Sequence, residues 1–215
     1  MKILLDFDDT LFHTAKFKED LIGVFEECGV SPEDFKKYYY DYSPNDSNSD
    51  LKRYVFESHI DRLSEILGID GENLRKKAHE FLSDTSAYLF SDVDEFLENF
   101  SKDDVYIISF GCDFLKIKIG NTGIGKKVSE IVTTDKVKEF AVGDLLGREK
   151  EKFDGEKIFF LDDRIDHLKS VKSKFPEIVS ILVSRPEGRY DCELDDSCDH
   201  CVRNFSEAKK IILGS

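Results

Sequence analysis

The sequence lacks a hydrophobic run long enough to cross a membrane, since no apolar stretch approaches the roughly 20 residues that a transmembrane helix needs. It also lacks a basic segment followed by an apolar one near its start, which is the pattern of a secretion signal. Cysteine is sparse, and the five thiols are an odd number that suits a reducing compartment better than a disulfide framework. We therefore expect a cytoplasmic protein.

Positive charge is also in short supply. The 215 residues include 31 Lys and Arg against 45 Asp and Glu, which gives a net charge of −14. A nucleic-acid backbone or an anionic membrane would repel such a chain, so neither is expected as a main partner. The length allows one generous domain, or one domain with a small insert.

What the sequence does have is a cluster of acids at its start. Lys2 to Leu5 is a short apolar run typical of a buried strand, and it ends in Asp6, Asp8 and Asp9, followed by Thr10. Ionised groups this close together repel one another and lose solvation when buried. A cation, or a positively charged side chain from later in the chain, would relieve the conflict. A polar turn with a charged helix cap is the simpler alternative.

Residues 13–88 show only helical patterns. Apolar residues at helical spacing predict helices over 13–28, 51–67 and 70–82, and a further helix is expected to begin at Pro32 with Ser31 as its N-cap. No strand candidate falls in this region. We predict an all-helical insert over residues 13–88, and a catalytic core made of residues 1–12 and 89–215.

Beyond the insert, apolar runs alternate with helical segments. Strands are expected at 105–108, 130–133, 158–161 and 179–183, and helices at 93–100, 136–146 and 166–175. This alternation predicts an α/β fold with a Rossmann-like parallel sheet covered on both faces. Ligands of such sheets bind beyond the carboxyl ends of the strands.

Polar residues follow several of these predicted strands. They are Asp6, Ser109, Lys136 and the pair Asp162 and Asp163. The set suits phosphoryl transfer, because a carboxylate can attack a phosphoryl group only if a cation cancels the repulsion between them. Magnesium prefers oxygen ligands such as these carboxylates.

Backbone N–H groups and a lysine would neutralise the remaining charge of a bound phosphate. Ser109 and the N–H groups of Phe110 and Gly111 can surround phosphate oxygens. Lys136 is chosen as the neutralising lysine because it lies between the third apolar run and the next helix. Five other lysines compete for this role, namely Lys116, Lys118, Lys126, Lys127 and Lys138.

The segment from Asp6 to Thr10 resembles the first motif, Asp-x-Asp-x-Thr, of the haloacid dehalogenase (HAD) superfamily. Ser109, Lys136 and Asp162 follow in the order of that family's later motifs. The resemblance implies a HAD-like core with a helical C1-type cap, and phosphatase chemistry. It implies that Asp6 is the nucleophile that forms an aspartyl-phosphate, and that Asp8 is the general acid and base.

Further expectations come with the resemblance. Thr10 would help to hold the first loop and would belong to the phosphate-binding residues. Mg²⁺ would be bound by Asp6, Asp8, Asp162 and Asp163, with Asp166 as an alternative to Asp163. Dehalogenases of the family lack an acid at the position of Asp8, so a phosphatase is favoured. A helical lid suggests a small phosphorylated metabolite as the substrate.

Other functions remain open at this point. The acceptor could be a sugar hydroxyl, which would make a phosphotransferase or phosphomutase, or the acidic cluster could serve a catalytically idle Mg²⁺-binding interaction module. Gly120 to Lys127 nearly fits a nucleotide-binding P-loop after a strand-like FLKIKI segment, but Lys127 stands where Ser or Thr is needed. A helix end and turn is the favoured interpretation of that stretch.

A second candidate metal site lies near the C-terminus. Cys192, Cys198, His200 and Cys201 fall within ten residues, and Cys198-x-x-Cys201 has the spacing of a zinc knuckle or a redox pair. A surface loop with incidental thiols is the favoured interpretation, since a structural zinc site needs four well-placed ligands.

Overall fold

A six-stranded parallel sheet forms the centre of the protein. The computed structural model describes residues 1–39, 54–111, 113–188 and 198–214. The strands are β1 (Lys2–Leu5), β2 (Val105–Phe110), β3 (Glu130–Thr134), β4 (Ile158–Asp162), β5 (Val179–Val183) and β6 (His200–Val202), and their order in the sheet is β3-β2-β1-β4-β5-β6. The predicted Rossmann-like α/β core is confirmed.

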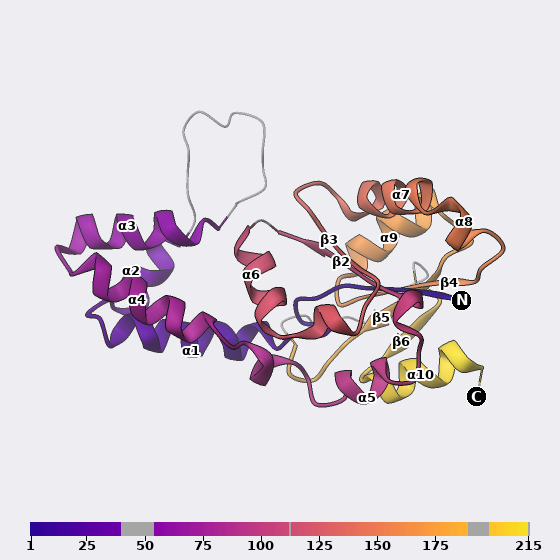
Figure 1. The fold of residues 1–215 in the computed structure, drawn as a ribbon, viewed down its shortest axis with the longest axis horizontal. Coiled ribbons are helices and arrows are strands. Elements are labelled where there is room, and N and C mark those ends of the chain that lie inside the picture. The colour runs from indigo at the N-terminus through magenta and orange to yellow at the C-terminus, as the bar shows by residue number, and fades with distance from the viewer. Residues whose placement is uncertain (40–53, 112, 189–197, 215) are drawn as a thin grey trace.

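Helices cover both faces of this sheet (Figure 1). Ile3 and Leu5 of β1 belong to the hydrophobic cluster that also contains Phe96 of α5 (Val93–Leu97) and Phe205 of α10 (Phe205–Leu213). Leu4 points the other way, into the cluster formed with α7 (Lys138–Arg148), α8 (Lys150–Phe153) and α9 (Ile165–Lys174). Successive residues of a strand face opposite sides, so a strand buried on both faces is apolar over most of its length.

The helices α1 (Thr14–Glu26), α2 (Pro32–Lys37), α3 (Phe56–Leu67) and α4 (Gly71–Leu82) form a separate group beside the sheet (Figure 1). Residues 13–39 and 54–88 contain no described strand. Ser31 caps α2 as predicted, since its Oγ accepts the N–H of Asp34 at 3.1 Å. α3 begins at Phe56 rather than at residue 51, and residues 51–53 lie outside the described ranges. The domain division at residues 13 and 88 stays a prediction.

Several elements differ from the predictions. The FLKIKI segment lies within helix α6 (Asp113–Asn121), so no strand precedes Gly120 and the P-loop alternative is wrong. Strand β6 and helix α10 were not predicted, although Asn204 caps α10 and Gly214 ends it with a φ of 70°. Short 3-10 turns span Ser86–Tyr88, Lys102–Asp104 and Ile124–Lys126. Within the described ranges, no helix is both long and apolar enough to span a membrane.

A buried histidine stabilises the helical group. The Nε2 atom of His59, on α3, lies 3.1 Å from the carbonyl oxygen of Phe35 and therefore carries the proton. Nδ1 is then the acceptor for the hydroxyl of Tyr54, also at 3.1 Å. Burial lowers the pKa of His59 to about 4, the carbonyl of Phe35 opposes this, and the nearby Arg62 and Lys18 lower it further.

This arrangement predicts a pH-dependent loss of stability. The pKa of His59 is lower in the folded than in the unfolded chain, so its contribution to folding is complete above about pH 6.5 and is lost as the pH falls towards 4. We expect His59→Gln to lose less free energy of unfolding than the native protein between pH 7 and pH 4.5. Urea unfolding at both pH values measures this difference. The exposed His79 is the control, and an equal change for His79→Gln would contradict the prediction.

Candidate active site

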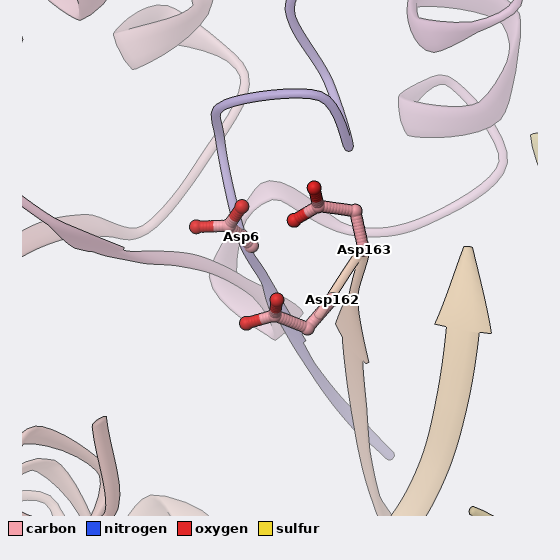
Figure 2. A group of neighbouring side chains, drawn as sticks. All are labelled: Asp6, Asp162 and Asp163. Atoms are coloured by element: carbon pink, nitrogen blue, oxygen red, sulfur yellow. The ribbon is translucent and has the colours of Figure 1, made fainter. Parts of the chain in front are cut away.

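Three carboxylates meet at the carboxyl ends of β1 and β4. Asp6 directly follows β1, and its N–H donates to the carbonyl of Leu161 in β4 at 2.9 Å. Asp162 is the last residue of β4, and Asp163 follows it. The chain runs outward from β1 through β2 and β3 and then returns to place β4 on the other side of β1, which is the switch point where α/β sheets bind ligands. Figure 2 shows the three side chains grouped there.

One buried lysine links two of these acids. Lys138 Nζ lies 2.5 Å from Asp6 Oδ1 and 2.6 Å from Asp162 Oδ2. The hydroxyl of Ser109, in β2, donates to the same Asp6 Oδ1 at 3.0 Å. Asp6, Lys138 and Ser109 therefore belong to one hydrogen-bonded group. The predicted site residues Asp6 and Ser109 are thus brought together.

The lysine in this group corrects a prediction. Lys136 was selected, but its side chain is exposed and its N–H caps the turn at Thr134 Oγ1. Helix α7 begins two residues later than predicted, so its first residue, Lys138, points under the strand ends. Lys138 was one of the competing lysines in the sequence, and only the position of α7 distinguishes it from Lys136.

Burial and charge shift the pKa values of the acids in opposite directions. Burial raises the pKa of Asp6 to about 6, against the attraction of Lys138 and together with the repulsion from Asp162. Burial also acts to raise the pKa of Asp162, but Lys138 and His167 outweigh it and lower that pKa to about 2. Burial would lower the pKa of Lys138, yet Asp162 and Asp6 raise it, so the lysine stays charged.

Asp163 is the acid that this network stabilises least. Burial, followed by repulsion from Asp6, Asp162 and Asp9, raises the pKa of Asp163 to about 10. One lysine cannot balance three buried carboxylates, so the group requires a proton or a further cation.

The donor set fits a hard divalent cation. Asp6, Asp162 and Asp163 each offer an oxygen, and these atoms lie within 4.8 Å of one another. Among the described residues, this is the one such group of three or more candidate ligands. Asp166 was the alternative to Asp163, but it pairs with Arg164 in two hydrogen bonds of 3.0 and 2.6 Å.

Asp8 is held by different partners. Its Oδ1 accepts from Lys118 Nζ at 2.5 Å and from Thr14 Oγ1 at 2.8 Å, and the structure does not include it in the acidic group that could bind a metal ion. Lys118, one of the lysines that compete with Lys136 in the sequence, is thus a site residue with a different partner. A signal was present, because Lys118 lies on the apolar side of α6 between the buried Leu115 and Ile119.

Lys118 sits among aromatic rings as well as beside Asp8. Its Nζ lies 4.8 Å from the ring centroid of Phe12, 5.3 Å from that of Phe17 and 5.7 Å from that of Phe7. Aromatic ring faces attract cations, so they help to accommodate an ammonium group in a nearly dry position.

Two other contacts orient Asp162. The backbone N–H of Arg164 donates to its Oδ1 at 2.9 Å, and Nδ1 of His167 lies 3.2 Å from both carboxylate oxygens. His167 was not selected from the sequence. It lies in the first turn of α9, where helical geometry returns it towards the end of β4.

The loop that follows β1 is fixed by Asp9 and Thr10. Asp9 has a φ of 59°, a left-handed conformation that Asp tolerates better than most residues, and it lies in the turn that follows Asp8. Thr10 is fully buried, and its carbonyl accepts from Arg185 Nε at 2.8 Å. Thr10 is therefore placed to hold the loop, and its assignment to the phosphate-binding residues stays a prediction.

A cavity of about 550 Å³ opens onto this group, between the strand ends and the helices α1 and α6. Asp6, Asp8, Ser109 and Lys138 all line it, as do Phe110 and Gly111. The N–H of Gly111 already donates to Thr134, so it is not free for phosphate. A Cβ at residue 111 would lie 2.7 Å from Leu115 Cδ2, so α6 can approach β2 this closely only at a glycine.

The cysteine cluster does not form a comparable site. Cys198 is buried, Cys201 is partly buried and His200 is exposed on β6, while Cys192 lies outside the described residues. Among the residues that are described, these side chains do not form a group of three close ligands.

The network predicts unequal effects for the two lysines. Lys138→Met should reduce the free energy of unfolding by about 3–5 kcal/mol, because it leaves buried carboxylates without their counter-ion. Lys136→Met should change it by less than about 0.5 kcal/mol, as is usual for exposed sites. Denaturant unfolding at pH 8 in EDTA gives both values. Equal losses in the two variants would contradict the central position of Lys138.

Comparison with known proteins gives matches in structure alone. No family model and no curated protein matches the sequence. A haloacid dehalogenase-like hydrolase from Burkholderia xenovorans superposes with a TM-score of 0.72 at 16% identity, covering 97% of this chain and 96% of that one. A 2-haloacid dehalogenase from Pseudomonas syringae gives 0.60 at 18% identity, covering 100% and 99%, and an L-2-haloacid dehalogenase from Xanthobacter autotrophicus gives 0.59 at 15%, covering 99% and 98%. The chain therefore has the fold of HAD-like hydrolases.

Proposed function

We propose that the protein is a Mg²⁺-dependent phosphohydrolase that cleaves a small phosphomonoester through an aspartyl-phosphate. The observation that carries this proposal is the buried Asp6 carboxylate, with Lys138 and Ser109 on one of its oxygens and Asp8 on the same cavity wall. This is the arrangement of a nucleophile beside an acid that can protonate a leaving group.

Asp6 is the proposed nucleophile. Within the described part of the chain, both hydrogen bonds to its side chain end on Oδ1, which leaves Oδ2 as the oxygen able to attack phosphorus. Attack forms a bond from Oδ2 to phosphorus and breaks the bond to the leaving oxygen. Lys138 and Ser109 hold the carboxylate in place during this step.

Asp8 is the proposed acid and base. It lines the same cavity and is fixed by Lys118 and Thr14. In the first step it gives a proton to the leaving oxygen, and in the second it takes one from the water that attacks the aspartyl-phosphate.

Asp6, Asp162 and Asp163 are the proposed ligands of the metal ion. When bound there, Mg²⁺ would offset the repulsion between the carboxylate of Asp6 and the phosphate. His167 and the N–H of Arg164 would orient Asp162 towards the ion.

The charge of the cavity supports an anionic substrate. The chain as a whole carries −14, yet five cationic side chains line the cavity against four acids. The cations are Lys18, Lys116, Lys118, Lys138 and Arg164. This cavity therefore repels a phosphate less than the rest of the surface does, and a divalent ion bound by Asp6, Asp162 and Asp163 would supply the attraction.

Haloacid dehalogenation is the second candidate, because two of the structures compared above are named as dehalogenases. A halide leaves without a proton, so that reaction needs no acid at the position of Asp8. The presence of Asp8 on the cavity wall favours the phosphatase. Release of chloride from a 2-chloro acid, without phosphate release from any ester, would support the dehalogenase instead.

Two further alternatives depend on the fate of the phosphoryl group. A phosphotransferase or phosphomutase would deliver it to a hydroxyl, which product analysis in added alcohol detects. An idle Mg²⁺-binding module would bind the ion but release no phosphate over a broad panel of esters.

Removing the nucleophile should abolish turnover. We expect Asp6→Asn to reduce the hydrolysis of p-nitrophenyl phosphate by at least about a thousandfold, since an amide cannot form the phosphoenzyme. Initial rates with Mg²⁺, together with circular dichroism to check the fold, measure this effect. Asp113→Asn, at an exposed acid of α6, should keep the native rate. Native turnover by Asp6→Asn would refute the assignment.

The metal site can be tested without turnover. Mg²⁺ should raise the thermal unfolding temperature of the native protein in proportion to its binding, and EDTA should reverse this rise. Asp163→Asn should weaken the apparent Mg²⁺ affinity by at least about tenfold. Asp166→Asn should leave the affinity unchanged, because Asp166 pairs with Arg164. A loss of affinity at Asp166 alone would assign the ligand to that residue instead.

A further inference from the structure

The wall of the cavity opposite the strand ends is built from aromatic and aliphatic side chains. Phe17 and Leu21 come from α1, and Phe114 and Leu115 come from α6. Tyr39 and Tyr54 complete the set, which we call the aromatic wall. It lies in the same cavity as Asp6 and Asp8, so a substrate bound through its phosphate would extend its leaving group towards these rings.

The rings of the aromatic wall pack against one another. Tyr39 and Tyr54 stack with centroids 4.0 Å apart and an interplanar angle of 9°. Phe114 meets Tyr54 edge to face at 4.9 Å and 81°, and on its other contact it stacks on Phe56 at 5.0 Å and 21°. Rings fixed in this way form a surface that exists before any ligand binds, which lowers the entropic cost of binding.

Tyr54 contributes its ring to the wall and not its hydroxyl. Its hydroxyl donates to Nδ1 of the buried His59, whose Nε2 is held by Phe35. The hydroxyl of Tyr54 is therefore hydrogen-bonded within the protein, and its ring is the part that lines the cavity.

The helices α1 and α6 offer the cavity few hydrogen-bond acceptors. The described residues that line it include no Asn, Gln or Glu. On the helices α1 and α6 the polar lining residues are Thr14, which donates to Asp8, and three lysines. Lys18 has its Nζ 4.1 Å from the centroid of Tyr39. Sugar hydroxyls that faced these two helices would find few acceptors, and burying unpaired hydroxyls is unfavourable.

We propose that the aromatic wall is the leaving-group subsite, and that the substrate is a phosphomonoester of an alcohol bearing a planar, apolar ring. This inference rests on the proposed phosphohydrolase function and adds the substrate class to it. Aromatic rings bind one another through offset or edge-to-face contacts, in addition to the burial of apolar area.

Three esters test the subsite with the same type of leaving oxygen. Benzyl phosphate, cyclohexylmethyl phosphate and glucose 6-phosphate are all primary alkyl esters that carry a six-membered ring next to the carbon bonded to the ester oxygen. We expect kcat/KM for benzyl phosphate to exceed that for glucose 6-phosphate by at least about tenfold, because the ring is buried as apolar area. It should exceed that for cyclohexylmethyl phosphate by about two- to tenfold, because the ring is aromatic.

A variant series assigns the preference to the wall. Phe114→Leu keeps apolar volume but removes a ring, so it should reduce the ratio of benzyl to cyclohexylmethyl turnover towards one. Tyr38→Leu is the matched control, since Tyr38 precedes Tyr39 but does not line the cavity. Its ratio should equal that of the native protein.

Failure of this proposal is distinguishable from failure of the proposed function. If all three esters are hydrolysed at similar kcat/KM, or if glucose 6-phosphate is preferred, the subsite is overturned and the phosphohydrolase stands. If no ester is hydrolysed, the phosphohydrolase falls, and calorimetry with benzylphosphonate and cyclohexylmethylphosphonate in Mg²⁺ decides the subsite. Tighter binding of benzylphosphonate that Phe114→Leu removes would support it, and equal or absent binding of both would overturn it.

Discussion

The repulsion among three buried carboxylates is the constraint on which this structure depends. Asp6, Asp162 and Asp163 lie buried at the ends of two adjacent strands, with carboxylate oxygens within 4.8 Å of one another. Lys138 offsets part of this repulsion by binding Asp6 and Asp162 at once. An apolar sheet core could not hold such a group without a counter-ion, so the position of α7, which supplies Lys138, is tied to the chemistry of β1 and β4.

The site separates its acids by giving them different lysines. Lys138 of α7 forms ion pairs with Asp6 and Asp162, whereas Lys118 of α6 forms an ion pair with Asp8. Two carboxylates only two residues apart in the first loop therefore experience different surroundings. Such a difference is what the proposed roles of these acids, Asp6 as nucleophile and Asp8 as acid and base, require.

The parts of the fold and site that could be predicted are those with strong local signals. The strands β1, β2, β4 and β5 are nearly continuous apolar runs, and the caps Ser31 and Gly68 mark helix ends directly. Strand β6 has three residues and too little pattern to detect, and α10 was overlooked although its caps were present in the sequence. The choice between Lys136 and Lys138 failed because helix boundaries are uncertain by a few residues from sequence, and two residues turn a side chain to another face of a helix.

The sequence by itself determined the parallel α/β core and the positions of acids at strand ends. Apolar runs that alternate with helical segments, and the acids that follow these runs, are local features of the sequence. The tertiary structure decided which cations meet those acids. It brought Lys138 to Asp6 and Lys118 to Asp8 across separations of 132 and 110 residues, which no local pattern encodes. It also brought together the residues of the aromatic wall, which come from α1 and α6 and include Tyr39 and Tyr54. Contacts between distant segments depend on how helices pack on the sheet, and packing is a property of the whole fold.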